Sequence, residues 1–276
     1  MWQSWMKCEK NAPDPSLTNL KTGLGHMTRA GFFYFILHYV MKFLRPFFSY
    51  YGGKWRAAPH YGQPLHNTII EPFAGGAGYS CRFYTRNVIL YDADPTIAGL
   101  WDYLIHVNAE EIMSLPLDIT HLDQMNLTQE QKWLIGFWIS KAGVVPKKSP
   151  SKWARDKVGL YWEERTRDRI ARQVPLIKHW QIRNESYINA PDQDATWFID
   201  PPYNNAAGQI YNTKFTDFAN LADWCRTRTG QVIVCEQEGA SWLPFQTFKT
   251  IQTTHGKRGK SKSAEVVWYN NQDNST

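Results

Sequence analysis

The sequence contains few cysteines, and none of them forms a recognisable pair. Its four cysteines lie far apart, at Cys8, Cys81, Cys225 and Cys235. No C-x-x-C spacing occurs, which argues against a zinc site and against a disulfide framework. This use of cysteine suits a reducing cytoplasm, where we expect the protein to reside, and we expect no bound metal.

The sequence also lacks a stretch that is apolar enough to cross a membrane. Its most apolar part, residues 31–48, contains His38, Lys42 and Arg45. The uninterrupted apolar runs are therefore far shorter than the roughly 20 residues that a membrane span needs. Arg29 ahead of this part imitates a signal peptide, but no small-residue cleavage site follows. We expect neither membrane association nor export.

Positive charge and aromatic rings are both plentiful. The 276 residues include 31 Lys plus Arg against 25 Asp plus Glu, which gives a net charge of +6, and they include 13 Trp, 14 Tyr and 14 Phe. A content of 43% hydrophobic and 20% charged residues excludes a wholly disordered chain. The combination suits an anionic partner that offers bases for stacking, although a soluble enzyme with a large aromatic core would have a similar composition.

Buried strands and helical stretches alternate in two parts of the chain. The first part predicts a strand, a glycine turn, a helix and a second strand, at residues 68–73, 74–78, 79–85 and 88–92. The second part predicts strands at residues 196–199, 231–235 and 264–269, with a helix at 217–226. This is the pattern of a doubly wound α/β sheet.

A basic, mostly helical region separates these two parts. Helical patterns occupy residues 129–141 and 151–173, and there is little sheet signal. Between residues 141 and 183, twelve Lys and Arg side chains face only four acids. The sequence therefore predicts an extension, two core parts and an insert between them, at residues 1–40, 41–102, 191–276 and 103–190.

The motif Asp200-Pro201-Pro202-Tyr203 follows a predicted buried strand. Two consecutive prolines cannot continue a central strand, so the chain must leave the sheet there in a stiff shape. Ligands of α/β sheets bind beyond the carboxyl ends of strands. The Asp200 carboxylate and the carbonyl after Pro201 can accept hydrogens from an exocyclic NH2 group, while Tyr203 stacks on the ring. The alternative is a plain turn between strand and loop.

A glycine-rich loop at residues 71–78 follows the first predicted strand. Its spacing matches neither G-x-G-x-x-G nor a Walker A motif, so it favours a nucleoside pocket over a pyrophosphate cradle. Asp92 ends the next strand and is placed either to bind ribose hydroxyls or to lie in a solvated turn. A third motif, residues 47–54, combines rings, a glycine pair and Lys54. It can close over a cofactor, with Lys54 donating to a carboxylate, or it can be a plain turn with a surface lysine.

Together these motifs resemble the Dam-like DNA N6-adenine methyltransferases. The shared order is an aromatic-x-G-G-K motif, E-P-F-x-G-G, D-x-D-P, a basic insert and D-P-P-Y, and the likeness covers about residues 41–270. The resemblance implies a Rossmann-like S-adenosylmethionine-dependent methyltransferase sheet with a helical target-recognition insert. It implies cofactor contacts at Tyr50, Gly52, Lys54, Glu71, Phe73, Gly75, Asp92 and Asp200, and catalytic roles for Asp200, Pro201, Pro202 and Tyr203.

The implied partner is double-stranded DNA, bound by a monomer. A target adenine must be flipped out of the duplex to reach the pocket. The expected DNA contacts are Lys152, Arg155 and Arg167 in the insert and Lys257 and Arg258 in a basic loop, which is otherwise a flexible hairpin tip. The rings that could fill the vacated stack are Trp153, Tyr161 and Trp162, although we favour a core position for each.

Other acceptors remain open, namely cytosine N4, RNA adenine and a protein glutamine. Among related families, Asp as the first residue of the motif favours adenine, because cytosine N4 enzymes commonly have Ser there and glutamine enzymes have Asn. A further alternative is a DNA-binding relative without catalytic activity. The presence of Asp200, Lys54 and Asp92 argues against that alternative.

Residues 1–40 show neither turn-bounded strands nor a clear helical period, and the recognisable motifs begin after Met41. We predict that this extension is dispensable. A chain that starts at Met41 should fold and keep its activity, measured by circular dichroism and by a methyl-transfer assay. Loss of either property would contradict the prediction.

Overall fold

The computed structural model describes residues 42–140, 143–150, 162–204, 215–253 and 261–270. The predicted extension at residues 1–40 lies outside this part of the chain.

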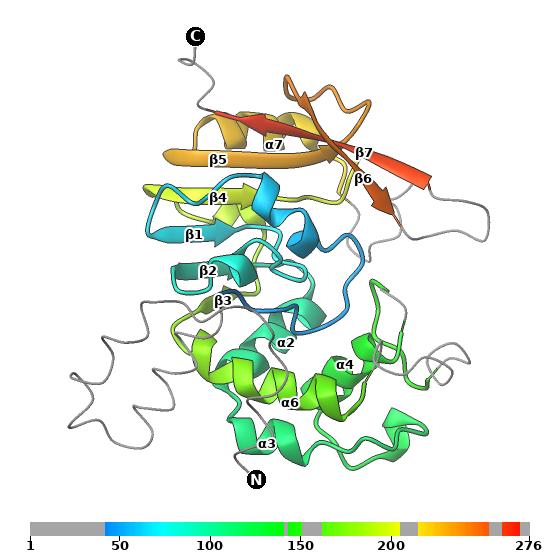
Figure 1. The fold of residues 1–276 in the computed structure, drawn as a ribbon. Helices are drawn as coiled ribbons and strands as arrows, with labels where there is room; N and C mark the ends of the chain where they lie inside the picture. The colour runs from blue at the N-terminus through cyan, green and yellow to red at the C-terminus, as the bar shows by residue number, and fades with distance from the viewer. Residues whose placement is uncertain (1–41, 141–142, 151–161, 205–214, 254–260, 271–276) are drawn as a thin grey trace, which may run out of the picture. The chain divides into compact units, whose positions relative to one another are not determined.

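A seven-stranded sheet forms the centre of the fold, with the order β3-β2-β1-β4-β5-β7-β6 (Figure 1). The strands are β1 Thr68–Glu71, β2 Asn87–Tyr91, β3 Gln181–Arg183, β4 Ala195–Ile199, β5 Gly230–Gln237, β6 Gln246–Thr253 and β7 Ser261–Tyr269. Strands β1 to β5 pair in parallel, and β7 runs antiparallel to both of its neighbours, β5 and β6. The predicted fold class, an α/β protein with a Rossmann-like sheet, is confirmed.

The order of the strands reverses between β1 and β4. From β1 the chain continues through β2 to β3 on one side, whereas from β4 it continues to β5 on the other. Loops that leave two adjacent parallel strands in opposite directions open a crevice at their carboxyl ends, and this is where α/β sheets bind ligands. The glycine turn follows β1 and the D-P-P-Y motif follows β4, so the topology places the two strongest sequence motifs at the same crevice.

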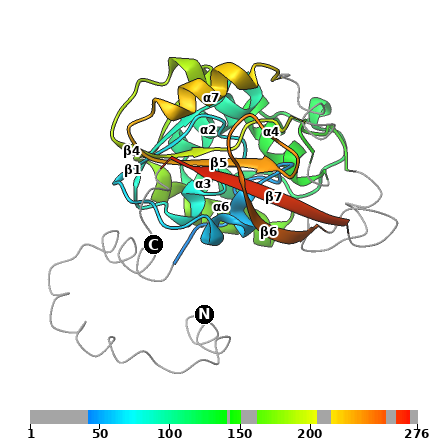
Figure 2. The same cartoon turned by 90° about the horizontal axis from the view of Figure 1, so that it is seen from above.

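Other parts of the chain cover both faces of the sheet. Helix α7 (Phe218–Arg226) lies over one face (Figure 2). Its Leu221 and Trp224 belong to one buried cluster with Trp197 of β4 and Val232 of β5, and Trp224 meets Trp197 edge to face at 5.4 Å. On the other face, the Tyr79 ring stacks on Phe198 of β4, with centroids 4.4 Å apart and an interplanar angle of 5°. The core is therefore a sheet buried on both faces, as parallel sheets require.

Among the residues that the structure describes between β2 and β3, four segments form α-helices. They are α2 Pro95–His106, α3 Ala109–Ser114, α4 Gln129–Trp138 and α6 Glu164–Gln173. Asp94 caps helix α2, because its side chain accepts a hydrogen bond from Thr96 N. Pro95 is the first residue of the helix. Helix α4 begins with a capping box formed by Thr128 and Gln131. Among the described residues, no helix combines the length and the apolar character that a membrane span requires.

Three predictions about local structure need correction. The helix predicted at residues 79–85 is a single 3-10 turn at Ser80–Arg82, because the chain enters β2 at Asn87 and leaves too few residues for a stable α-helix. Strand β3 lies within residues 103–190, where the sequence gives little sheet signal. Strand β6 was not predicted either. The division of the chain into core parts and insert remains a prediction.

A glycine at the start of β5 provides a test of the sheet packing. At Gly230, φ is +96° and an added Cβ would lie 2.3 Å from Ala195 O. Gly239 has the same φ, but nothing lies within 4 Å of an added Cβ. Both Gly→Ala changes strain the backbone, and only Gly230→Ala also pushes β5 away from β4. Gly230→Ala should therefore lower the free energy of unfolding by about 1–3 kcal/mol more than Gly239→Ala. Equal losses in urea unfolding would contradict this.

Candidate active site

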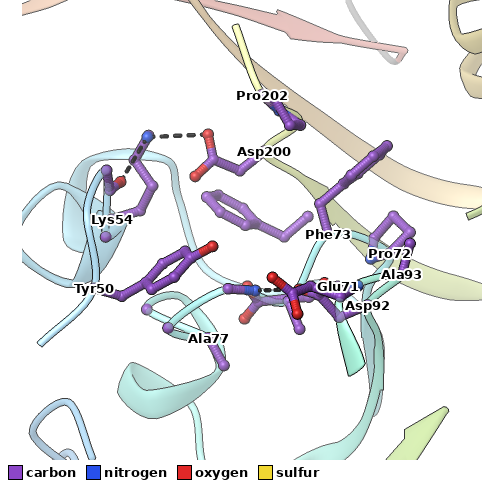
Figure 3. A pocket seen from close by; sticks show the side chains of 18 of the residues that line it. Tyr50, Lys54, Glu71, Pro72, Phe73, Ala77, Asp92, Ala93, Asp200 and Pro202 are labelled. Atoms are coloured by element: carbon purple, nitrogen blue, oxygen red, sulfur yellow. Dashed lines mark hydrogen bonds and ion pairs between the residues drawn. The ribbon is translucent and has the colours of Figure 1, made fainter. Parts of the chain in front are cut away.

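An open cavity lies at the carboxyl ends of β1, β2 and β4 (Figure 3). Its lining includes residues 50–54, the loop after β1, the loop after β2, residues 186 and 187 after β3, and Asp200 and Pro202 of the D-P-P-Y motif. Of the sequence-predicted residues, the cavity brings together Tyr50, Gly52, Lys54, Glu71, Phe73, Gly75, Asp92, Asp200 and Pro202.

The glycine turn after β1 packs closely against the backbone of Lys54 and Trp55. An added Cβ at Gly78 would lie 2.4 Å from Trp55 N and 2.9 Å from the carbonyl carbon of Lys54. Only glycine therefore lets these two backbones approach so closely. The turn also carries Ala77 with φ +44°, a left-handed conformation that costs energy for a residue with a side chain. The predicted glycine turn thus serves to seat the Lys54 segment as well as to line the cavity.

Asp92 is held in the cavity wall by backbone donors. Its Oδ2 accepts a hydrogen bond from Gly75 N at 2.9 Å, and its Oδ1 accepts one from Asp94 N at 2.9 Å. Burial raises the pKa of Asp92 to about 6, against the lowering effect of these hydrogen bonds. The group is therefore mostly ionised at neutral pH, and its carboxylate lines the cavity with lone pairs left to accept further hydrogen bonds.

Lys54 and Asp200 form a shielded ion pair. The Lys54 Nζ lies 3.0 Å from Asp200 Oδ1 and donates to Gly52 O at 2.9 Å, and the two side chains are only 6% and 20% exposed (Figure 3). The same ammonium lies over the Tyr203 ring, 4.9 Å from its centroid. The surface-lysine alternative is therefore wrong. The ammonium is directed at the D-P-P-Y motif.

The pair is ionic at neutral pH. Burial raises the pKa of Asp200 to about 6, although the nearby ammonium opposes this shift. Burial alone would lower the pKa of Lys54, but the Asp200 carboxylate raises it well above its usual value. Lys54 thus stays charged over the whole range in which Asp200 titrates. It also occupies Oδ1 of that carboxylate, which leaves Oδ2 for another donor.

Glu71 differs from the other acids of the cavity. Its Oε1 accepts a hydrogen bond from Ser80 N at 2.7 Å, and the residue is only 2% exposed. Burial raises the pKa of Glu71 to about 8, so the group is mostly protonated at neutral pH. One of its roles is thus structural, because it joins the end of β1 to the 3-10 turn that begins at Ser80.

The electrostatics of the cavity favour a cationic ligand. Among the described residues that line it, the acids Asp92, Asp94 and Asp200 face a single cation, Lys54, which Asp200 already pairs. A phosphate group would meet repulsion from this wall, whereas a sulfonium or an ammonium group would be attracted. In the described ranges, no group of three or more His, Cys, Asp or Glu side chains is placed to hold a metal ion.

The two other predicted residues of the D-P-P-Y motif, Pro201 and Tyr203, lie next to the cavity and are not among the residues that line it. Pro201 is buried, and Tyr203 lies beside Lys54. The Tyr203 hydroxyl is buried and has no hydrogen-bond partner in the described structure. Its ring is therefore held mainly by packing and by the ammonium rather than by its hydroxyl.

Four residues of the cavity wall, Phe198 of β4 among them, were not expected from the sequence. The other three, Ser186, Tyr187 and Phe215, line the cavity together with the predicted Phe73. The Phe73 and Tyr187 rings stack with centroids 5.3 Å apart, and Phe215 meets Phe73 edge to face at 5.6 Å. Residues 186 and 187 follow β3, so recognition of that short strand would have marked them as residues beyond a strand's carboxyl end.

The helical region holds the segment that precedes Lys54. The buried Gln173 amide clamps the backbone of Arg45, because Arg45 N donates to Gln173 Oε1 at 3.0 Å and Gln173 Nε2 donates to Arg45 O at 2.9 Å. Trp138 Nε1 donates to Phe47 O at 2.8 Å. One wall of the cavity is therefore positioned by side chains from the end of α4 and of α6.

The predicted DNA contacts are for the most part not described. Lys152, Arg155, Lys257 and Arg258 lie outside the described residues, as do Trp153 and Tyr161. Arg167 is described, and its guanidinium donates to Leu115 O at 3.2 Å and pairs with Asp168 at 3.3 Å, with 14% of the side chain exposed. These bonds are made within the helical region. Trp162 is 2% exposed and donates to Pro116 O at 2.7 Å, which confirms its favoured core position.

Comparisons with known proteins add little to this geometry. No family model and no curated protein matches the chain. Among solved structures, it is similar to a conserved hypothetical protein of Streptococcus pyogenes, with 12% identity, a TM-score of 0.32 and coverage of 72% of this chain and 84% of that one. It is also similar to a Haemophilus influenzae protein provisionally described as a methylase, with 11% identity, a TM-score of 0.32 and coverage of 78% and 84%. Likenesses this weak carry no argument about function, which rests on the site.

The ion pair generates a stability prediction. Lys54→Met leaves a shielded carboxylate without its partner, and we expect it to lower the free energy of unfolding by about 3 kcal/mol. Asp200→Asn leaves the ammonium unpaired and should also destabilise the fold. The double variant should lose less than the sum of the two, because each single change already removes the interaction. Urea unfolding of all four proteins measures this, and strictly additive losses would contradict the pair's importance.

Proposed function

We propose that this protein is an S-adenosylmethionine-dependent methyltransferase that acts on N6 of an adenine flipped out of double-stranded DNA. The observation that carries the proposal is the single cavity shared by Asp200 beyond β4, the glycine turn beyond β1 and Asp92 beyond β2. A donor site and an amine site at adjacent strand ends allow direct transfer between two bound ligands.

The residues of the cavity fit S-adenosylmethionine. Asp92 would accept hydrogen bonds from the ribose hydroxyls, and the Phe73 and Tyr187 rings offer apolar faces to a base. The excess of acids over cations suits the positive charges of the sulfonium and amino groups, and it disfavours a phosphorylated cofactor. When bound, this cofactor supplies an activated methyl group. The protein's own task is to bring an amine to it.

The D-P-P-Y corner is suited to orienting that amine. Lys54 holds Asp200 ionised and occupies its Oδ1, so Oδ2 can accept a hydrogen from an exocyclic NH2 group. The two prolines fix the direction in which the corner leaves the sheet. Tyr203 would stack on the base that carries the amine. Catalysis would then come from orientation and from exclusion of water, and it requires no strong base.

The choice of adenine in DNA rests on the resemblance and on the charge of the chain. An aspartate begins the motif, as in the N6-adenine enzymes, and most of the surplus positive charge lies in the region between β2 and β3. That region would contact phosphates while the flipped base occupies the cavity.

A labelling experiment tests this proposal. The protein is incubated with methyl-labelled S-adenosylmethionine and duplex DNA, and the DNA is digested to nucleosides. We expect labelled N6-methyladenine. The Asp200→Ala variant should transfer methyl groups at least about 100-fold more slowly, because the amine loses its fixed acceptor. Asp102→Ala, at an aspartate whose side chain is 65% exposed, is the matched control and should retain activity.

Other outcomes would redirect or overturn the proposal. Label found only in N4-methylcytosine would show a different acceptor base, and label found only in RNA or protein, when these replace the DNA in parallel reactions, would show a different class of acceptor. If calorimetry detected no binding of S-adenosylmethionine to the wild type, the DNA-binding relative without catalytic activity would become the better description.

A further inference from the structure

One buried acid anchors the loop that carries the D-P-P-Y motif. Glu236 lies near the end of β5 and is 1% exposed. Its Oε1 accepts hydrogen bonds from Asn204 N at 2.9 Å and from Trp242 Nε1 at 3.2 Å, and its Oε2 accepts one from Gln237 N at 2.7 Å. This carboxylate thus ties the residue after Tyr203 to the strand next to β4.

The loop needs such an anchor because it has few donors of its own. The ladder between β4 and β5 ends at Ile199 and Val234. Pro201 and Pro202 have no backbone N–H, so they cannot extend the pairing. The Asn204 N–H is therefore an important attachment point, and a carboxylate is a stronger acceptor for it than a neutral group. Burial of an acid is costly, and the three hydrogen bonds offset that cost.

The ion pair and the Glu236 anchor hold the motif at its two ends along the chain. Lys54 holds the motif at Asp200, before the prolines, and Glu236 holds it at Asn204, after Tyr203. Residues 200–204 are thus held at Asp200 and at Asn204, and the two prolines between these contacts restrict the backbone further. The Tyr203 ring lies between the two attachment points, so its orientation depends on both.

We propose that Glu236 is a positioning residue for the methyl acceptor, an inference that rests on the proposed function of the site. It sets the orientation of Tyr203, and hence that of the stacked base, without touching either substrate. The residues that we assign to the donor come largely from other segments, namely Tyr50, Gly75 and Asp92. Loss of the anchor should therefore impair methyl transfer while leaving donor affinity nearly unchanged.

Two variants and a matched control test this role. Glu236→Ala removes all three hydrogen bonds, Glu236→Gln keeps one acceptor oxygen in the same shape, and Glu238→Ala changes an exposed acid two residues further on. We expect Glu236→Ala to lower kcat at least tenfold, Glu236→Gln to recover part of that loss and Glu238→Ala to stay within twofold of the wild type. The Kd of S-adenosylmethionine, measured by calorimetry, should stay within twofold in all three.

A second measurement is independent of methyl transfer. In a peptide that covers residues 200–204, the prolines carry no amide, so hydrogen exchange reports mainly on Tyr203 and Asn204. Glu236→Ala should speed this exchange at least tenfold, with slow exchange retained in β4. If the wild type transferred no methyl group, the proposed function would fail, and the exchange experiment would still decide whether the anchor exists.

The inference is overturned by any of three results. Exchange in residues 203–204 that is the same in wild type and Glu236→Ala would show that the carboxylate does not hold the loop. An active wild type with unchanged kcat in Glu236→Ala would show that the anchor does not position the acceptor. Parallel losses of kcat and of donor affinity would point to a general structural role.

Discussion

The site depends on a lysine and an aspartate that are both shielded from water and pair with each other. Lys54 precedes β1 in the sequence and Asp200 directly follows β4, so their contact joins two separate parts of the cavity wall. Neither charge is well placed without the other, because an unpaired charge in such a position is costly. The pair thus couples the formation of the cavity wall to the charge state and orientation of the carboxylate.

Sheet topology explains why this contact arises. The strand order reverses between β1 and β4, and the loops that leave those two strands diverge. Residues that are distant in the sequence, in the glycine turn and in the D-P-P-Y motif, thereby face one space. The acidic character of that space and the aromatic faces of Phe73 and Tyr187 favour ligands that combine a flat ring with positive charge. The position of the candidate site is therefore set by where the strands end.

Much of this arrangement was predictable from the sequence, because the central strands are short apolar runs that end in turn residues. The strands β1, β2, β4 and β5 and the motifs that follow them were identified in this way. Strand β3 has only three residues and a mostly exposed pattern, so its apolar signal is weak and the wall residues after it were missed. The direction of Lys54 and the attachment of Glu236 depend on partners from other strands, which local patterns do not reveal.

The hydrogen bonds between Gln173 and Arg45 and between Trp138 and Phe47 have a consequence for protein engineering. They knit the region between β2 and β3 to a segment on the amino-terminal side of β1. Exchange of that region for a counterpart from another protein would strip the clamp from the cavity unless the recipient's own segment were exchanged along with it. Any exchange of this region therefore has to treat these two non-contiguous pieces as one structural unit.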